Sequence, residues 1–214
     1  MRRPIMDREQ QWQVIEQRRR AVADLLDDLT PAEWESPSLC AGWRVRDVAA
    51  HLAMAPQPPG PAAMVRLGIQ AGGRFHRMNH DVAVRYSDRP DLAGEIRAHA
   101  ASRRLPAVTS YRNIFFDVIV HAQDIARPLG RTVDVAPRAA AVAAQRVWTM
   151  GWPFWAKRHL RGLRLAAVDI EWSTGAGTPV HGPILDLLLV MTGRSVAVAN
   201  LRGPGVEALS HRLR

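Results

Sequence analysis

The chain of 214 residues is poor in cysteine, in lysine and in long apolar runs. Cys40 is its one cysteine, which excludes an internal disulfide framework and any cysteine-rich zinc site. The longest strongly apolar run, residues 184–191, contains Asp186 and is much shorter than the ~20 residues of a membrane-spanning helix. The first residues also lack the apolar stretch of a signal peptide. We therefore expect a soluble, cytoplasmic protein with no membrane partner.

The net charge of +9 comes almost entirely from arginine, because Lys157 is the one lysine. The arginines fall in separate clusters, at residues 18–20, 103–104 and 158–164, rather than in one basic stripe. A solvated surface explains this pattern better than a nucleic-acid interface does, so nucleic acid is not an expected partner. The excess of positive charge would still attract an anionic small molecule.

Several segments carry apolar residues at helical spacing. Residues 7–29 contain neither glycine nor proline, and their apolar residues form a helical stripe. Thr30 to Glu33 has the form of a capping box, with Pro31 at the first helical position. Further helices are expected over residues 43–54, 62–80, 91–104, 111–127 and 137–150.

The pattern changes in the last quarter of the chain. Residues 163–172 end in an alternation that is typical of a strand, and residues 173–177 form a glycine-rich turn. A helix is expected over residues 183–192 and a short strand over residues 195–201. The sequence thus predicts a helical bundle followed by a small α/β part.

The helix expected over residues 111–127 is apolar almost all round, which is typical of a buried helix. It nevertheless carries Asp117 and His121, whose spacing of four residues puts both side chains on the same side. A buried carboxylate is costly unless it is paired or bound to a metal. The pair can chelate one divalent ion, and a structural hydrogen bond between the two side chains is the alternative.

His51 is a candidate for a third ligand. It lies next to the apolar stripe of Val48 and Leu52, so it can face the interior of the bundle. Three ligands from two helices would leave an open position on a tetrahedral metal, as in catalytic sites. The alternative is a core histidine that is hydrogen-bonded to Asp47 or to a neighbouring helix.

Other candidates are weaker. His76 and His80 have a His-x-x-x-His spacing, but their polar neighbours indicate an exposed stretch. Cys40 would need a thiolate-stabilising environment to be a nucleophile, and a buried structural cysteine is favoured. The chain has no Gly-x-Gly-x-x-Gly, Walker or Gly-x-Ser-x-Gly motif, so nothing indicates a nucleotide-dependent enzyme or an α/β-hydrolase.

Three segments follow one known pattern in the same order. Residues 34–52 show a tryptophan, then Pro-x-x-Cys-x-Gly-Trp, then Val-x-Asp and His-Leu. Residues 117–124 show Asp-x-x-x-His-x-x-Asp, and residues 169–194 a looser third match. The three segments resemble the mycothiol-dependent maleylpyruvate isomerase family, which usually has a glutamate at the position of Asp117.

The resemblance implies a mainly α fold, a DinB-like four-helix bundle with a small C-terminal α/β domain. The metal-binding bundle would span residues 1–157 and the α/β domain residues 158–214. The family's His, Glu and His ligands carry over to His51, Asp117 and His121. The cofactors implied are a divalent metal, with Zn²⁺ expected, and mycothiol. An arginine-rich sequence is compatible with an actinobacterial source.

The resemblance further implies an isomerase or transferase in which the metal activates the thiol as a thiolate that reacts with a small electrophilic substrate. The alternative is a non-catalytic DinB-like ligand-binding or regulatory module that has lost its activity, for which Asp117 would be the sign. The small-molecule thiol and the electrophile are the expected partners, and a homodimer stays open.

Overall fold

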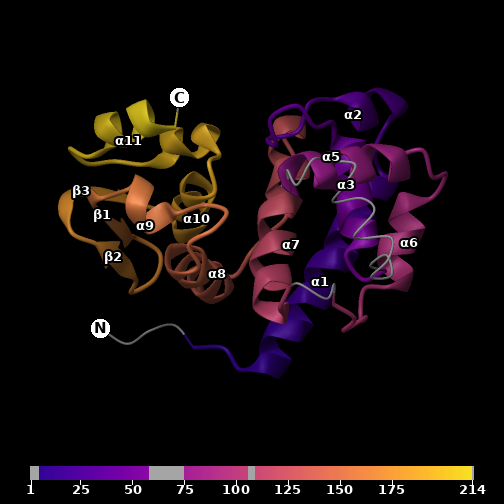
Figure 1. Cartoon of the computed structure of the whole chain (residues 1–214), viewed down its shortest axis with the longest axis horizontal. Helices are drawn as coiled ribbons and strands as arrows, with labels where there is room; N and C mark the ends of the chain where they lie inside the picture. The colour runs from indigo at the N-terminus through magenta and orange to yellow at the C-terminus, as the bar shows by residue number, and fades with distance from the viewer. Residues whose placement is uncertain (1–4, 58–74, 106–108, 214) are drawn as a thin grey trace. The chain divides into compact units, whose positions relative to one another are not determined.

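A computed structural model of the chain describes residues 5–57, 75–105 and 109–213, and the side chains of residues 75–79 lie outside this description. The chain divides into two compact units (Figure 1). One unit is Trp12–Val133, and the other combines Met1–Gln11 with Asp134–Arg214. Each unit has its own buried apolar core.

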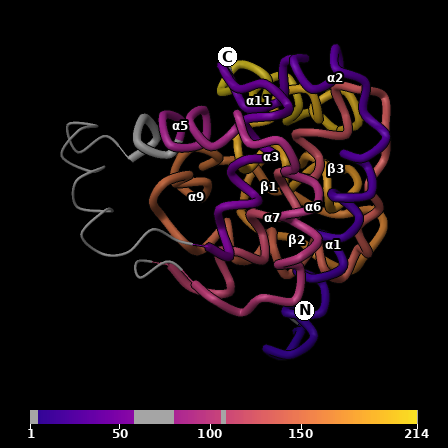
Figure 2. Tube along the Cα trace, turned by 90° about the vertical axis from the view of Figure 1, so that its right-hand side faces the viewer, coloured from indigo at the N-terminus to yellow at the C-terminus, as the bar shows by residue number. Residues whose placement is uncertain are grey.

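The unit Trp12–Val133 is helical. Its helices pack around α3, which contacts α5, α6 and α7 (Figure 2). Its described helices are α1 Arg8–Asp27, α2 Pro31–Glu35, α3 Val45–Met54, α5 Phe75–Tyr86, α6 Leu92–Ala98, α7 Tyr111–Ala126 and the 3-10 helix η1 Arg127–Leu129.

Local sequence signals explain where these helices begin. The predicted capping box at α2 is confirmed: the Thr30 hydroxyl accepts from the Glu33 N–H at 3.3 Å, and Glu33 accepts from the Thr30 N–H at 2.8 Å. At α3, the Asp47 carboxylate accepts from the Arg44 N–H at 2.9 Å and also pairs with the Arg44 guanidinium. These contacts fix the residue at which α3 begins. They therefore also fix the position of His51 along the helix.

Two helices have bounds that differ from the predicted ones. The helix expected over residues 91–104 is wrong in length, because α6 ends at Ala98 and the chain turns from His99 onward. The helix expected over residues 62–80 is described only from Phe75, and it continues to Tyr86; residues 62–74 lie outside the described residues.

The unit Asp134–Arg214 joins helices to a small sheet. In this sheet β1 lies in the middle, antiparallel to β2 and parallel to β3. Helix α10 packs on α8, on η2 and on β1. The elements are α8 Pro137–Thr149, α9 Ala156–His159, β1 Gly162–Ala167, β2 Ser173–Gly175, β3 Gly177–Gly182, α10 Ile184–Met191, η2 Ser195–Asn200 and α11 Val206–Arg212.

Three predictions in this unit are wrong. The alternation at the end of residues 163–172 does not form a strand, because β1 ends at Ala167 and residues 168–171 bend. The segment expected as a glycine-rich turn, residues 173–177, forms β2 and the first residue of β3. The strand expected over residues 195–201 is the 3-10 helix η2, in which backbone N–H groups bond to carbonyls three residues earlier. Its alternation of valine and alanine does not mark a buried face, because Val196 is 52% exposed and Ala197 is the one buried residue of η2.

The contacts place α8 with the C-terminal unit, whereas the sequence places the domain boundary at residue 157. The division into domains at 1–157 and 158–214 stays a prediction. The fold class is mainly α with a small three-stranded sheet, as predicted. None of the described helices is both long enough and apolar enough to cross a bilayer.

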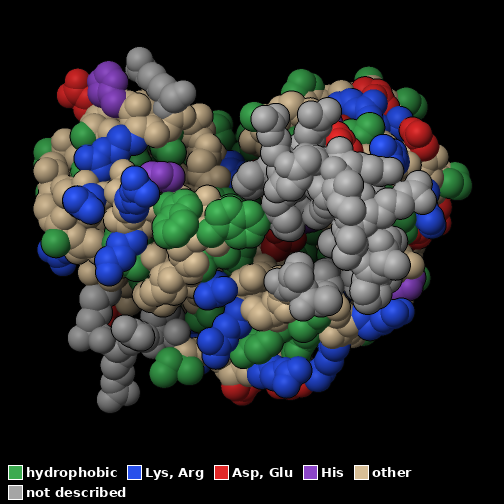
Figure 3. Space-filling view, viewed as in Figure 1, with side chains coloured by type: hydrophobic (Ala, Val, Ile, Leu, Met, Phe, Trp, Pro, Cys, Tyr) green, Lys and Arg blue, Asp and Glu red, His purple; other side chains and the backbone are tan. Residues whose placement is uncertain are grey.

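Basic side chains are scattered on the surface. On the face shown in Figure 3, the Lys and Arg side chains of each unit lie among apolar, acidic and other groups, and no continuous basic stripe is visible. Many arginines of the helical unit pair with carboxylates, as Arg97 does with Asp24 at 2.9 Å and Arg46 with Glu35 at 2.8 Å.

Gly177 provides a test of the sheet. Its φ is +122°, and a Cβ there would lie 2.1 Å from the carbonyl oxygen of Gly162 on the neighbouring strand. We expect Gly177→Ala to lower the free energy of unfolding by more than ~2 kcal/mol, because backbone strain and a backbone clash add. Gly193→Ala is the control, since Gly193 has φ +90° but open space, and should cost only about 1–2 kcal/mol. Urea unfolding measures both, and equal losses would contradict the close approach of β1 and β3.

Candidate metal centre

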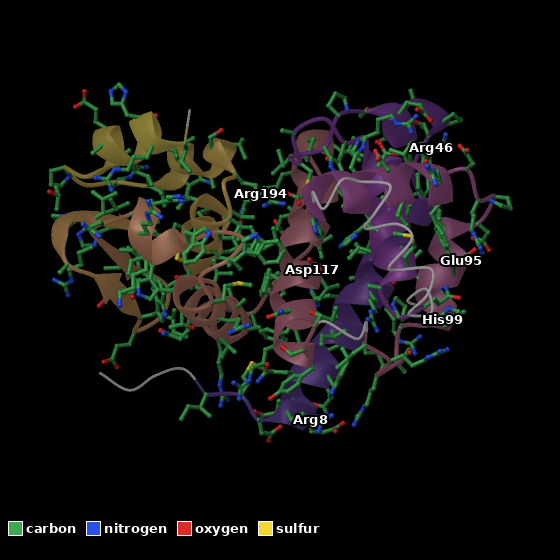
Figure 4. The ribbon with its side chains drawn as sticks, viewed as in Figure 1. Arg8, Arg46, Glu95, His99, Asp117 and Arg194 are labelled. Carbon is green, nitrogen blue, oxygen red and sulfur yellow. The ribbon has the colours of Figure 1, made fainter. Side chains whose placement is uncertain are left out.

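Helices α3 and α7 bring the three predicted ligands together. His51 lies on α3, and Asp117 and His121 lie one turn apart on α7, with Asp117 midway along the helix (Figure 4). Side-chain exposures of 20%, 25% and 15%, respectively, leave the cluster partly buried but open to a small ligand. Their donor atoms all lie within 4.8 Å of one another.

The spacing of the donor atoms suits a tetrahedral ion. Nε2 of His51 lies 3.3 Å from Oδ2 of Asp117, and Nε2 of His121 lies 3.4 Å from Oδ1 of the same carboxylate. A tetrahedral ion with ligands at ~2.0–2.1 Å keeps its donor atoms ~3.3–3.4 Å apart. The two imidazole rings stand edge to face, with centroids 4.9 Å apart. The two separations involve different oxygens of Asp117, and each is compatible with a pair of ligands on one tetrahedral ion.

Charge couples the three groups. Burial acts to raise the pKa of Asp117, but His121 and His51 outweigh it and hold that pKa well below its usual range. Burial acts to lower the pKa of His121, but Asp117 outweighs it and raises that pKa well above 6.5. The metal-free cluster therefore pairs a carboxylate anion with a protonated His121. A divalent cation would take the place of that proton.

A second carboxylate bonds to the ring nitrogen of His121 that does not face Asp117. Asp124 is fully buried, and its Oδ2 accepts from the Nδ1–H of His121 at 2.8 Å. Because the carboxylate occupies Nδ1, Nε2 is the ring nitrogen that points at Asp117. A carboxylate that fixes a histidine in this way sets both the tautomer and the ring orientation of a metal ligand.

Cys40 shares the same carboxylate. Its Sγ–H donates to Oδ2 of Asp124 at 3.0 Å, and its Sγ lies 3.7 Å from Nδ1 of His121. The loop that carries Cys40 is fixed to α7, because the Leu39 N–H donates to the backbone carbonyl of Asp124 at 3.2 Å. The sequence favoured a buried structural cysteine, whereas Cys40 is half-buried and its Sγ contacts His121 and Asp124 of the candidate centre.

Cys40, His121 and Asp124 form a second group close enough to hold a metal. Their separations distinguish them from the first group. Distances of 2.8 and 3.0 Å to Asp124 are hydrogen-bond lengths and are shorter than the ~3.3 Å between two ligands of one tetrahedral ion. The group around Asp117 therefore has the longer separations that an ion between its donor atoms requires, and the group around Asp124 is closed by short hydrogen bonds.

The rival histidine pair is only partly described. The His80 ring packs edge-on against Trp43, with centroids 5.4 Å apart, and its Nδ1 lies 3.4 Å from Asp81. Trp43 also packs edge-on against His51, at 6.0 Å. Among the described residues His80 joins no metal-binding group, and the side chain of His76 lies outside them.

Sequence reasoning assigned no role to Asp124, although the signal was there. Asp124 lies three residues after His121 on one helix, a spacing that puts both side chains on one face. The contact of Cys40 with this pair joins residues more than 80 positions apart, and no local pattern predicts it.

Asp124 and Cys40 can be tested together. We expect Asp124→Asn to weaken zinc binding by about 10–100-fold, because the neutral amide holds the His121 ring less firmly. Cys40→Ser keeps a donor to Asp124 and should leave zinc affinity within about threefold of the wild type. Competitive titration with a zinc chelator measures both. A large loss in Cys40→Ser would instead place the metal in the group of Cys40, His121 and Asp124.

The chain is similar to known proteins in one segment of its sequence and in its fold. The family model of the mycothiol maleylpyruvate isomerase N-terminal domain matches residues 15–58, which include Cys40 and His51. A comparison with curated proteins found no match to the chain. The crystal structure of the mycothiol-dependent maleylpyruvate isomerase has a similar fold, with a TM-score of 0.53 at 17% identity over 88% of this chain and 90% of that one.

A second crystal structure, of a histidine-to-alanine mutant of the mycothiol-dependent maleylpyruvate isomerase, has a TM-score of 0.52 at 18% identity over the same shares of both chains. At these identities the structures show the fold, and the family model identifies the N-terminal segment. The family resemblance and the fold class predicted from the sequence are thereby confirmed. Residues 15–58 thus match the model of the mycothiol maleylpyruvate isomerase N-terminal domain, and the chain has a fold similar to that of the isomerase.

Proposed function

We propose that this protein is a metal-dependent enzyme that uses a small thiol, mycothiol, to isomerise or conjugate a small electrophilic substrate. The observation that carries the proposal is the convergence of His51, Asp117 and His121 at the spacing of a tetrahedral ion. The family match over residues 15–58 supports the choice of thiol, since the proteins of similar fold are described as mycothiol-dependent.

The donor set fits Zn²⁺. Two imidazoles and one carboxylate are ordinary zinc ligands, and three protein ligands leave a fourth position for a substrate or cofactor. The shorter side chain of Asp117 is not an obstacle, because its two oxygens face the two imidazoles separately, at 3.3 and 3.4 Å. Asp117 therefore suits a ligand role despite lacking the extra methylene of glutamate.

The ligands and the residues around them have separate roles. A bound divalent ion supplies the positive charge that ionises a coordinating thiol. His51 and His121 present Nε2 toward the ion position, and Asp124 keeps His121 in that orientation. The Trp43 ring packs edge to face with the His51 ring, with centroids 6.0 Å apart. Partial burial of the ligands limits the access of water and so strengthens the local electrostatic interactions.

Metal content and turnover test the proposal. We expect about one zinc per chain in protein purified without a histidine tag, and none in His121→Ala, because that change removes one of three ligands. His211→Ala is the matched control, since His211 is exposed on α11 and should leave the zinc in place. Mycothiol-dependent isomerisation of maleylpyruvate by the zinc-loaded protein should be lost only in His121→Ala.

Two outcomes would contradict it in different ways. A wild-type protein that takes up no zinc even when zinc is added would rule out the metal centre. Stoichiometric zinc without any thiol-dependent turnover of maleylpyruvate or of simple electrophiles would leave a metal-bound ligand-binding module, the non-catalytic alternative.

The pKa shifts give a pH test. Without metal, the raised pKa of His121 contributes stability that is present below 6.5 and is lost as pH rises through the folded-state pKa. The lowered pKa of Asp117 contributes stability that is present above 3.8 and is lost as pH falls. We therefore expect metal-free protein to lose stability as pH rises above about 6.5, and stabilisation by zinc to grow over the same interval, because zinc must displace the His121 proton.

Thermal unfolding of the metal-free and zinc-loaded protein across this pH range measures both effects. In His121→Ala the dependence on pH and the stabilisation by zinc should both diminish. A gain in Tm on adding zinc that is the same at every pH would show that zinc binds without displacing a proton from His121.

A further inference from the structure

Arg19 occupies a core position of helix α1. The buried stripe of this helix recurs every three or four residues, and Arg19 falls in it with only 2% of its surface exposed. The sequence places this residue in a surface cluster of three arginines, and for Arg19 that interpretation is wrong. The stripe consists of Trp12, Ile15, Arg19, Val22 and Leu26.

The hydrogen bonds of the Arg19 guanidinium are made by one of its two terminal nitrogens. Its Nη1 donates to the backbone carbonyls of His99, Ala100 and Ser102 at 3.3, 3.2 and 2.9 Å. Its Nη2 is buried and has no hydrogen-bond partner among the described residues. No carboxylate of the described chain forms an ion pair with it. A buried guanidinium without a carboxylate partner is costly, so its retention calls for a reason.

Arg19 lies at the level of Asp117. Helices α1 and α7 run in the same direction, since the Trp12 and Tyr111 rings pack near their starts at 6.2 Å, and Arg131 Nη2 bonds to the Asp28 carbonyl beyond their ends at 3.1 Å. Arg19 follows Trp12 by seven residues and Asp117 follows Tyr111 by six, so both have advanced by roughly 10 Å along their helices.

The electrostatics agree with this placement. Burial lowers the pKa of Arg19 from 12.5 to about 10, and the charge of Asp117 acts against that change. Arg19 therefore remains a cation at neutral pH. It is a fixed positive charge inside the bundle that senses the carboxylate of the candidate centre.

The net charge around the ion favours one kind of fourth ligand over another. A divalent ion with Asp117 and Asp124 is neutral in sum, and Arg19 adds one positive charge. An anionic fourth ligand brings the total to zero with Arg19 present and to minus one without it. We propose that Arg19 is a positioning residue whose buried charge makes the metal centre favour an anion, such as a thiolate, in its open position. This inference rests on the proposed function, because it needs the metal.

The two affinities are predicted to change in opposite directions, whereas structural damage would lower both. Removing the cation should strengthen binding of a metal cation and weaken binding of an anion to the metal-loaded protein. We expect Arg19→Gln to raise Co²⁺ affinity by about tenfold and to lower the affinity of the Co²⁺-loaded protein for 2-mercaptoethanol by about tenfold. Glutamine keeps an amide donor for the carbonyls at the end of α6.

The experiment uses the full chain. Co²⁺ is titrated by its visible absorption, and thiolate binding is then followed by the sulfur-to-cobalt charge-transfer band. Arg19→Lys keeps the charge and should leave both affinities within about threefold of the wild type. Arg20→Gln is the matched control on the same helix, since Arg20 is 52% exposed and pairs with Glu16 at 2.9 Å; it should change neither affinity.

The outcomes separate this inference from the proposed function. Opposite changes in Arg19→Gln, with both affinities kept in Arg19→Lys, would support it. Affinities that fall together in Arg19→Gln, or that both fall in Arg19→Lys, would show that Arg19 only supports the fold. If Arg19→Gln fails to fold, Arg19→Met, which is also uncharged and of similar length, takes its place in both titrations. Failure of the wild type to bind Co²⁺ would overturn the metal centre and this inference with it.

Discussion

The hydrogen bond between Nδ1 of His121 and Asp124 is the interaction on which the candidate centre depends. At 2.8 Å and fully buried on the carboxylate side, it fixes which face of the imidazole is available. Nε2 then points at Asp117, and Asp117 in turn faces His51 on α3. The same carboxylate accepts from Cys40, so the loop before α3 is tied to the back of α7. One buried acid thus links α7, the loop and, through two further side chains, α3.

This arrangement places several charges where apolar side chains would be cheaper. Asp124 is buried with two donors on one oxygen, and Arg19 is buried with half of its fork unpaired. Such groups are seldom retained for stability alone, since apolar replacements of similar volume are often neutral or stabilising. Asp124 lies on α7 beside His121, and Arg19 lies on α1. The helical unit therefore buries one acidic and one basic side chain, each held by hydrogen bonds to other parts of the chain.

The sequence predicts the parts of this site that follow from helix periodicity and from the family pattern. Asp117 and His121 are paired by their spacing, and His51 is added by its place on an apolar stripe. Arg19 was misread because two neighbouring arginines on the same helix are more exposed, and a run of like residues hides the one that turns inward. In the C-terminal unit, the sequence predicts a strand where the structure has the 3-10 helix η2. An alternation of two residues indicates a half-buried strand only if a neighbouring strand is present to pair with it. The described sheet ends at β3, so η2 has no such neighbour. Contacts between distant segments, such as Cys40 with Asp124, depend on tertiary packing and have no local signature.

Asp117 stands where the family pattern usually has a glutamate. A carboxylate that is one methylene shorter can meet an imidazole on the neighbouring helix only if the two helices lie close together, and the distance between packed helices depends on the size of the side chains at the contact. In this chain the Asp117 oxygens reach both rings, at 3.3 Å from Nε2 of His51 on α3 and 3.4 Å from Nε2 of His121 on α7. The shorter side chain is therefore consistent with a ligand set that has been kept, rather than with one that has been lost.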